Sequence, residues 1–450
     1  MSLKSVHITN HYHKNSGGVS TAYNKLLEAA NRRKRHVRLI VPGAETEIEE
    51  VGEYGRIYYI KAGFSPIIDK RYRILIPWKT YMPDGSPIKT ILRDEKPDLI
   101  EIGEKYFLSL MAGLLRKRQM NVSQVRPMLV QYSHERMDDS IRTFMAKGRA
   151  FDWFASQLVG NYIVPMFDFH IANSDYTSQE LIDSESKVRG PLDSASPFNI
   201  FWRYWRAPKS GSKDRVYVNQ CGVDNDLFTI NRQNAATREK IHQDNKLPDE
   251  ALILLYAGRL SPEKNIALLP KLMKILRQDQ TRDFRLLVAG SGPSAETLAA
   301  QFEKLAPGAV TMLGHISDKN DLAGLFANCD AFVHPNPHEP FGITPLEAMA
   351  SGLPVVAPNS GGVLSYADNE NSWLAEPNAE SFAAAVLDVF SGDDKRIKKI
   401  EQAITTSRKY SWEDSTDRLF ALYDKIYEKF TANRELYDYE TPPPEIDFSR

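Results

Sequence analysis

The sequence predicts an α/β fold with two domains, each built on a mostly parallel sheet. Its 450 residues exceed what one hydrophobic core usually organises, so two domains of ordinary size and an appendage are expected. Short apolar runs with strand character alternate with helical segments through most of the chain, which is the pattern of β–α–β units. Hydrophobic residues make up 42% of the chain, as in a globular protein.

Charge and cysteine content exclude several classes of protein. The chain has 57 Lys and Arg against 58 Asp and Glu, so it lacks the basic field that drives nucleic-acid binding, and no nucleic-acid partner is expected. Cys221 and Cys329 lie far apart without zinc or redox spacing, which favours a reducing cytoplasm. No apolar run approaches the roughly 18 residues of a membrane span, and no secretory signal is evident. We expect a soluble cytoplasmic protein, with docking on the inner membrane leaflet as an open alternative.

In the first half, residues 5–9 form the first predicted strand and residues 19–30 have helical periodicity. The pair Gly17-Gly18 lies between them. A glycine turn between a strand and a helix can cradle a phosphate with its backbone N–H groups, although most such pairs are only turns. Further strands are predicted at residues 37–41, 56–61, 98–102, 128–132 and 169–173, and helices at 88–96 and 174–182.

Histidines follow two of these strands. His134 comes at the carboxyl end of the strand at 128–132, where it could hydrogen-bond a sugar hydroxyl and steady charge at a reacting carbon. The alternative is a structural histidine. His11 and His13 have no third metal ligand nearby and are interpreted as loop residues.

The second half opens with a strand at 252–256, and Arg259 and Lys264 then bracket the start of an amphipathic helix that ends at residue 276. Two cations at a helix start suit a diphosphate, the alternative being two solvated surface cations. The strand at 284–289 leads into Gly290, in a turn that formally matches the dinucleotide fingerprint. That fingerprint is incomplete, because the next strand, at 310–313, ends in Gly314-His315 without a ribose-binding acid.

The stretch from Asp330 to Gly362 combines a strand, a Pro-rich loop, a short helix, a second strand and a glycine turn. Glu339 lies on the loop, where the alternative to a functional role is a solvated acid. Thr344 is predicted to cap the helix, and Glu347 stands where a capping box would place its acid. A strand followed by a helix N-terminus is where open parallel sheets bind phosphorylated ligands.

Glu339 and Glu347, within the string EPFGITPLEAMASGLPVVA, resemble the paired-glutamate signature of family 4 retaining glycosyltransferases, which have the GT-B fold. The resemblance is strong over residues 215–429 and looser over the first 180. It implies two Rossmann-like domains that face each other across a cleft. The predicted parts are an acceptor domain (1–218), a donor domain (219–411), a helix returning to the first domain (412–432) and a tail (433–450).

The resemblance also implies a role for each site residue. Glu339 and the backbone of Phe341, Gly342 and Ile343 are expected to hold the donor sugar, and Glu347 the ribose. The Gly17-Gly18 amides, Arg259 and Lys264 are expected on the diphosphate, the turn at Gly290 and the segment with His315 and Ile316 around the nucleotide, and His134 at the reacting carbon.

The mechanism that the resemblance implies is front-face transfer, in which the leaving diphosphate oxygen takes the proton of the acceptor hydroxyl. It implies no protein base, no metal and no cofactor besides the nucleotide sugar. Asp224-Asn225-Asp226 looks like the metal-binding acid pair of the other major glycosyltransferase fold, but falls in an interdomain turn.

The segments 100–106 and 133–138 resemble stretches of mannosyl-transferring members, which implies GDP-mannose as the donor. The alternatives are a transferase that uses a UDP-sugar (glucose or N-acetylglucosamine), a sugar-phosphate synthase of the same fold, a nicotinamide-dependent oxidoreductase and an inactive binding module.

Residues 184–214 form an insertion that departs from the family pattern. Its run from Phe198 to Arg206 alternates aromatic rings with Arg203 and Arg206, a composition that suits anionic lipid headgroups. We expect this run to form part of the acceptor site or a peripheral membrane contact, for a glycan or lipid-linked acceptor. The alternative is that the rings anchor the insertion to its own domain.

Overall fold

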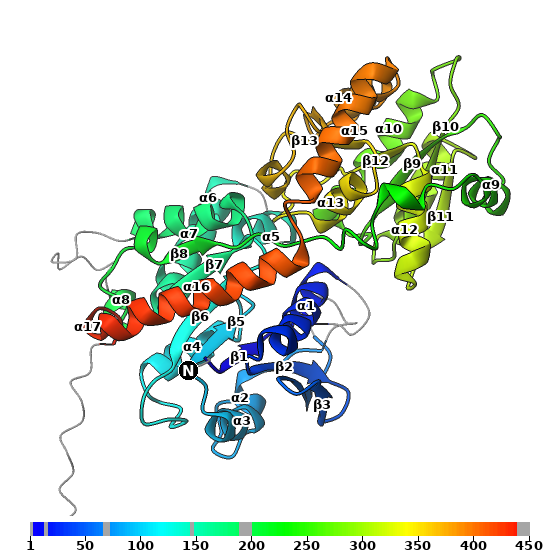
Figure 1. Cartoon of the computed structure of the whole chain (residues 1–450). Helices are drawn as coiled ribbons and strands as arrows, with labels where there is room; N and C mark the ends of the chain where they lie inside the picture. Colours follow the sequence, from blue (N-terminus) through cyan, green and yellow to red (C-terminus); the bar gives the residue numbers. More distant parts are fainter. Residues whose placement is uncertain (1–2, 13–16, 66–72, 145–147, 189–199, 439–450) are drawn as a thin grey trace, which may run out of the picture. The chain divides into compact units, whose positions relative to one another are not determined.

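The computed structural model describes residues 3–12, 17–65, 73–144, 148–188 and 200–438 (Figure 1). The chain divides into two compact units. Unit 1 contains Met1–Asn219 and Thr416–Arg450, and unit 2 contains Gln220–Ser415. The first observed boundary therefore lies one residue after the predicted one, and the chain returns to unit 1 through its C-terminal helix.

Unit 1 has an eight-stranded sheet in the order β3-β4-β2-β1-β5-β6-β7-β8. All neighbouring strands are parallel except β3 and β4, which are antiparallel and form one edge. The strands are β1 (Ser5–Ile8), β2 (Val37–Gly43), β3 (Glu47–Val51), β4 (Gly55–Lys61), β5 (Leu99–Ile102), β6 (Met128–Ser133), β7 (Phe169–Ala172) and β8 (Val216–Val218). The sequence predictions are confirmed for β1, β2 and β4 to β7. Strand β3 was missed because its run Glu47–Val51 is largely exposed and acidic, and the short β8 was not predicted as a strand.

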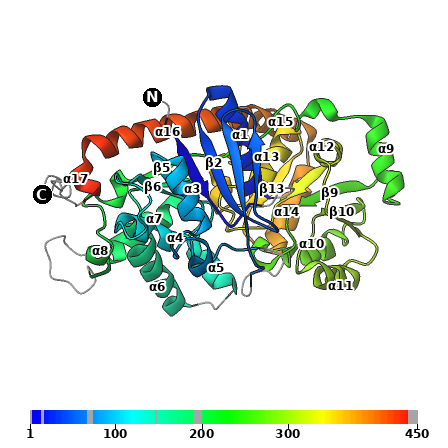
Figure 2. The ribbon, with the colours of Figure 1, turned by 90° about the horizontal axis from the view of Figure 1, so that it is seen from below.

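Helices cover both faces of this sheet. They are α1 (Gly18–Arg33), α2 (Pro77–Thr80), α3 (Pro87–Glu95), α4 (Ser109–Arg116), α5 (Met137–Phe144), α6 (Arg149–Leu158), α7 (Asp175–Val188), α8 (Ile200–Tyr204), α16 (Trp412–Ala432) and α17 (Arg434–Tyr437). Figure 2 shows α16 and α4 on opposite sides of β5 and β6. Strand residues alternate between the two resulting cores: Leu39 of β2 packs with α1 and α16, and its neighbour Ile40 packs on the α4 side.

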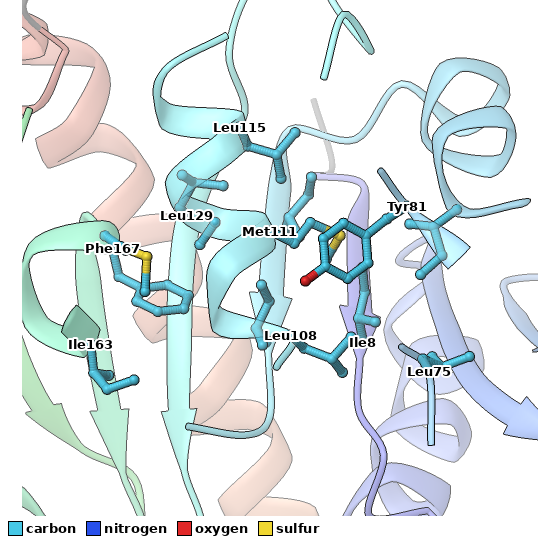
Figure 3. Packing of buried hydrophobic residues seen from close by; sticks show 14 of the residues in the cluster. Ile8, Leu75, Tyr81, Leu108, Met111, Leu115, Leu129, Ile163 and Phe167 are labelled. Atoms are coloured by element: carbon cyan, nitrogen blue, oxygen red, sulfur yellow. The ribbon is translucent and has the colours of Figure 1, made fainter. Parts of the chain in front are cut away.

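The core on the α4 side is shown in Figure 3. Met111 and Leu115 project from α4 toward the sheet, where they join Ile8 of β1 and Leu129 of β6 in one buried cluster. Tyr81 is fully buried in the same cluster, and its hydroxyl donates to the carbonyl oxygen of Phe107. This packing holds the strands whose ends carry the candidate site.

Unit 2 has a six-stranded, fully parallel sheet in the order β11-β10-β9-β12-β13-β14. The strands are β9 (Leu252–Ala257), β10 (Phe284–Ala289), β11 (Val310–Gly314), β12 (Ala331–Val333), β13 (Val355–Pro358) and β14 (Trp373–Ala375). The helices are α9 (Ala235–Asp244), α10 (Leu268–Leu276), α11 (Ala295–Leu305), α12 (Lys319–Asn328), α13 (Ile343–Ala350), α14 (Ala379–Val389) and α15 (Asp393–Ser407). A core shared by α10, α11 and α14 covers one face of the sheet.

Each sheet has one point where the order of the strands reverses. In unit 1 it lies between β1 and β5, and in unit 2 between β9 and β12. The loops that leave the carboxyl ends of two such strands diverge to opposite faces of the sheet, which leaves a crevice suited to ligands. Gly17 follows β1, whereas Lys264 and Glu339 follow β9 and β12, so the predicted site residues cluster at these two points.

Candidate active site

The loop after β12 carries Glu339, whose carboxylate is buried rather than solvated, with 12% of its side chain exposed. Lys264 Nζ donates to both carboxylate oxygens, at 3.1 and 2.9 Å. Asn336 Nδ2 donates to Oε2 at 2.9 Å. The loops that follow β9 and β12 therefore meet through an ion pair between two predicted site residues.

This environment keeps Glu339 ionised. Burial alone would raise the pKa of a carboxyl group, but the charge of Lys264, aided by His334 and Asn336, lowers the pKa of Glu339 to about 2. An ionised carboxylate only accepts hydrogen bonds, and sugar hydroxyls donate them. Glu339 is therefore suited to hold a sugar by its hydroxyl groups.

Lys264 does not stand at the start of the predicted amphipathic helix. It ends a short 3-10 turn, Pro262–Lys264, after which Asn265 adopts a left-handed conformation with φ 53°. The Asn265 side chain donates to the carbonyl oxygen of Pro335 at 2.9 Å, which ties this turn to the loop after β12. Helix α10 begins only at Leu268. Arg259 lies half-buried earlier on the same loop.

The predicted capping box at Thr344 and Glu347 is wrong. Helix α13 begins at Ile343, and its N-cap is Gly342, with φ 90° and no side-chain cap. A Cβ atom at Gly342 would lie 2.8 Å from the Tyr366 hydroxyl, so both the backbone conformation and the space require glycine. The amides of the first turn of α13 consequently have no side-chain cap from this residue, which is the state expected of a helix N-terminus that binds a ligand.

Glu347 therefore has no capping role; it is the fifth residue of α13 and is half-buried. Burial, together with the negative charge of Asp224, raises its pKa to about 7, against a smaller opposing effect of Lys319. The two predicted glutamates thus differ in charge state near neutrality, Glu339 being ionised and Glu347 partly protonated.

The side chain of Phe341 points into the interior of unit 2, so only its backbone is available to a ligand. Its ring is buried, with 2% exposed, and packs against the rings of Tyr366 and Tyr410 at centroid distances of 5.3 and 6.1 Å. This packing fixes the start of α13 from behind. Ile343 follows as the first residue of the helix.

Gly290 has a packing role beside any contact with a nucleotide. Its N–H donates to the carbonyl oxygen of Gly314 at 2.7 Å, and a Cβ atom here would lie 1.9 Å from the carbonyl oxygen of Gly258. Glycine is therefore required for the loops after β9 and β10 to approach. His315 follows β11 and is exposed, and Ile316 is half-buried.

In unit 1, Gly17 is the N-cap of α1 and Gly18 its first residue. Gly17 has φ 98° and no side-chain cap, and both glycines are exposed. The backbone N–H groups at the start of this 16-residue helix therefore lie near the strand-reversal point of the sheet, without a side-chain cap. His11 is half-buried on the preceding loop, and His13 lies outside the described residues.

His134 follows β6, as predicted, and is held between two tyrosine rings. Tyr132 stacks on it at a centroid distance of 4.4 Å, and Tyr23 of α1 meets it edge-on at 5.9 Å. Among the described residues its Nε2 atom has no hydrogen-bond partner. Burial lowers its pKa to about 4, with Glu101 opposing and His11 and Lys105 adding to the effect. The imidazole is therefore neutral near pH 7.

Glu101, to which the sequence pattern assigned no role of its own in the site, connects several side chains near His134. Its carboxylate is 1% exposed. It lies 2.9 Å from His7 Nδ1, accepts from the Tyr23 hydroxyl at 3.1 Å and also accepts from the Tyr423 hydroxyl of α16. Burial would raise the pKa of Glu101, but these partners and His134 lower it. An acid inside the apolar run LIEI was the sequence signal that could have found it.

The two stretches that resemble mannosyl-transferring proteins contact each other. Lys105 Nζ donates to the Glu135 carbonyl oxygen at 2.6 Å and forms a buried ion pair with Glu180. Glu180 also accepts the N–H groups of Met137 and Asp138, at 2.6 and 3.0 Å, at the start of α5. This buried network fixes the loop that presents His134.

The predicted insertion is only partly separate from the domain. Helix α7 continues to Val188, beyond the predicted end at 182, so the first part of 184–214 is helical. Trp202 Nε1 donates to the Gly160 carbonyl oxygen at 3.1 Å, and both Trp202 and Trp205 are buried in the core of unit 1. The two tryptophans are therefore anchors, whereas Phe201 and Tyr204 of α8 are each 54% exposed. Phe198 lies outside the described residues.

No metal site is evident in the described ranges, where no three His, Cys, Asp or Glu side chains gather closely enough to hold one ion. Asp224 instead accepts the N–H of Leu227 at 3.1 Å in a turn. Within the same ranges, the helices are all too short or too polar to cross a membrane.

Several known proteins are similar to this chain in sequence or in fold. Residues 237–406 match the family described as glycosyl transferases group 1. Over 399 residues the chain is 26% identical to a GDP-mannose-dependent alpha-(1-6)-phosphatidylinositol dimannoside mannosyltransferase from Mycobacterium tuberculosis, which covers 88% of this chain and 90% of the relative. A D-inositol 3-phosphate glycosyltransferase from Stackebrandtia nassauensis is 33% identical over 239 residues, about half of each protein (49% and 51%).

Two solved structures share the fold. Sucrose-phosphate synthase from Thermosynechococcus elongatus matches with a TM-score of 0.70 and 20% identity, covering 95% of this chain and 100% of the other. Anabaena HepE in complex with UDP matches with a TM-score of 0.66 and 16% identity, covering 94% and 100%. The predicted fold class is confirmed, with two parallel-sheet α/β domains.

Proposed function

We propose that this chain, which has the GT-B fold and matches the glycosyl transferases group 1 family over residues 237–406, transfers mannose from GDP-mannose to a hydroxyl group of a glycan or lipid-linked glycan. The observation that carries the proposal is the contact between Lys264 and Glu339, which joins a cation suited to a diphosphate to a carboxylate suited to a sugar. Mannose is chosen because of the mannosyltransferase that is similar over 88% of this chain.

The reaction proceeds with retention at the anomeric carbon. The bond from that carbon to the diphosphate oxygen breaks while the acceptor oxygen forms a bond on the same face, and the acceptor proton passes to the leaving oxygen. Lys264, Arg259 and the amides at Gly17-Gly18 stabilise the charge that develops on the diphosphate. Glu339 holds the sugar, Glu347 the ribose, and neutral His134 hydrogen-bonds a sugar hydroxyl near the reacting carbon.

Transfer in this scheme needs no metal ion, because cations of the chain stabilise the leaving group. We expect full activity in excess EDTA. Activity that is lost in EDTA and restored by Mn²⁺ or Mg²⁺ would contradict this part of the proposal.

A panel of nucleotide sugars tests the donor. A ligand present at about 100 times its Kd stabilises the folded state by about 2.7 kcal/mol, so the preferred donor raises the melting temperature most. GDP-mannose is expected to exceed UDP-glucose, UDP-N-acetylglucosamine and ADP-glucose. A larger increase in melting temperature with a UDP-sugar would contradict the mannosyltransferase assignment and favour a UDP-sugar-dependent transferase. NMR of the product then gives the anomeric configuration.

We propose a cytoplasmic protein that docks on the inner leaflet through the exposed face of α8, where it meets a lipid-linked acceptor. Ile200, Phe201 and Tyr204 are exposed there, and Lys117 Nζ lies 3.5 Å from the centre of the Tyr204 ring. Exposed rings beside cations suit the headgroup region of an anionic bilayer.

The membrane contact is tested with the double variant Phe201→Ser with Tyr204→Ser. Sedimentation with anionic liposomes should fall while the melting temperature and donor hydrolysis stay unchanged. Leu364→Ser serves as the matched control, since Leu364 is 45% exposed but belongs to unit 2. Unchanged liposome binding in the double variant would rule out this surface.

A further inference from the structure

His334 is a buried histidine at the donor site that no step described so far uses. It follows β12 directly, and its N–H donates to the Val356 carbonyl oxygen at 2.9 Å, which fixes its backbone to β13. Its ring stacks over Phe332, at a centroid distance of 6.5 Å and an angle of 15°. Only 7% of the side chain is exposed. The ring is thus held in one place by the sheet.

The Nε2 atom of His334 points at the site. It lies 3.5 Å from Glu339 Oε2, which is beyond a good hydrogen bond, and it has no hydrogen-bond partner among the described residues. A buried polar atom without a partner costs free energy, so its persistence calls for an explanation. Burial, only partly opposed by Glu339, lowers the pKa of His334 to about 4, so the ring is neutral near pH 7 and can still donate from Nε2.

Lys264 has three N–H donors and two of them are on Glu339, so only one is left for the diphosphate of a bound donor unless the ion pair opens. Lys264 Nζ now donates to both oxygens of Glu339, whereas the proposed function assigns Lys264 to the diphosphate and Glu339 to the sugar. Moving Lys264 to a phosphate would leave a buried carboxylate with Asn336 as its remaining side-chain donor. Such a loss is costly unless another donor takes over.

We propose that His334 is a positioning residue for Glu339, taking over the carboxylate when the diphosphate of the donor draws Lys264 away. A movement of a few tenths of an ångström brings Nε2 and Oε2 into hydrogen-bond range. Glu339 then keeps one fixed orientation, with its other lone pairs free for sugar hydroxyls. This inference rests on the proposed function and adds an order to it: the diphosphate must bind before the sugar subsite becomes available.

The replacement of Lys264 by His334 as the partner of Glu339, here called the handover, is tested first without a nucleotide sugar, by NMR of protein labelled with [¹⁵N]histidine. The His334 signal is assigned as the one that is missing in His334→Gln. Saturating GDP should move the Nε2 signal of His334 toward a hydrogen-bonded donor. Lys264→Ala should produce the same shift without GDP, and the control Lys271→Ala, on the exposed side of α10, should not. A Lys264→Ala spectrum identical to the wild type overturns the proposal, whichever nucleotide the enzyme uses.

Kinetics give the second test. His334→Phe keeps the ring but removes the donor, and should lower kcat about tenfold while the affinity for GDP stays unchanged. His334→Gln, whose amide nitrogen reaches the position of Nε2, should recover to within about threefold of the wild type. Equal losses of GDP affinity and kcat in His334→Phe, or no recovery in His334→Gln, would indicate a purely structural histidine. If His334→Phe does not fold, the NMR test on the wild type and Lys264→Ala still decides.

A free sugar distinguishes this inference from the donor assignment. Mannose alone should bind the wild type negligibly but bind measurably in the presence of GDP. Binding of mannose that is independent of GDP contradicts the handover. Failure of GDP to bind, with success of another nucleoside diphosphate in the same scheme, contradicts the donor assignment alone.

Discussion

Each unit places a histidine at the end of an inner strand, the half-buried His134 after β6 and the buried His334 after β12, and the two sites are built in different ways. In both, burial lowers the pKa of the ring to about 4, and a nearby carboxylate opposes that shift. Around His334, the partner Glu339 lies five positions along the same loop. Around His134, the carboxylate of Glu101 is joined to His7, Tyr23 and Tyr423, which lie 94, 78 and 322 positions from it.

The two sites differ in how many elements of the chain they are assembled from. The Lys264–Glu339 pair of the proposed donor site joins two loops at one strand reversal of unit 2. The His134 site needs three strands, helix α1 and the return of α16 from the far end of the chain. Changes in the donor loops should therefore affect chemistry with little loss of stability, whereas changes around Glu101 should affect both.

The largest effect is expected from Lys264→Ala and Glu339→Ala. Each removes a preorganised charge and should lower turnover by about a hundredfold or more, while the melting temperature changes little. Turnover and thermal unfolding of the purified variants check this, with Lys271→Ala as a control that keeps wild-type rates. Near-normal turnover in Lys264→Ala would show that Lys264 does not stabilise the diphosphate.

The next effect concerns Tyr423→Phe, which deletes one donor to the buried Glu101 carboxylate. We expect a loss of about 1–3 kcal/mol in the free energy of unfolding, and a shifted NMR signal of His134, because the Glu101 carboxylate that also holds Tyr23 against His134 loses one of its donors. Tyr204→Phe, which alters a hydroxyl on an exposed ring, is the control and should change neither. An unchanged His134 signal in Tyr423→Phe would show that α16 does not influence the surroundings of His134.

A moderate effect is expected from pH. His134 and His334 bind a proton at about pH 4 when folded and near pH 6.5 when unfolded, so the unfolded state binds more protons between these values. Stability should therefore fall as the pH decreases from about 6.5 to 4, and each histidine should contribute at most about 1.4 kcal/mol per pH unit. Thermal unfolding of His134→Gln and His334→Gln should show a flatter dependence than the wild type. A wild-type slope in both variants would contradict the assignment.

The smallest effect is expected from the different pKa values of Glu339 and Glu347, which should give their Gln variants different stabilities at pH 8. The pKa of Glu347 is raised to about 7, so the stability associated with its protonated form is lost as the pH rises from about 4.5 through 7. Glu347→Gln stays neutral and should melt slightly higher than the wild type at pH 8 but not at pH 5, while binding GDP-mannose more weakly. The Glu339 carboxyl has a lowered pKa, so Glu339→Gln should show no such gain at pH 8.

The sequence by itself determined the order of elements and most of the donor site. Apolar runs such as Leu252–Ala257 and Phe284–Ala289 are buried on both faces of a parallel sheet, so their composition alone marks them as strands. Glu339, Gly342 and Glu347 lie within one short string whose local chemistry, a Pro-rich loop before a helix, can be recognised without knowing the fold. Locally encoded features are therefore those that sequence analysis predicts.

Only the tertiary structure decided which of these residues touch. The Lys264–Glu339 ion pair, the approach of His334 and the contacts of Glu101 join positions that are distant in the sequence or that carry no motif. It also corrected the local interpretation of Thr344 as a cap and of Trp202 and Trp205 as a surface, because burial depends on neighbours contributed by other elements. Charge state and exposure are properties of the packed surroundings, and a linear pattern does not contain them.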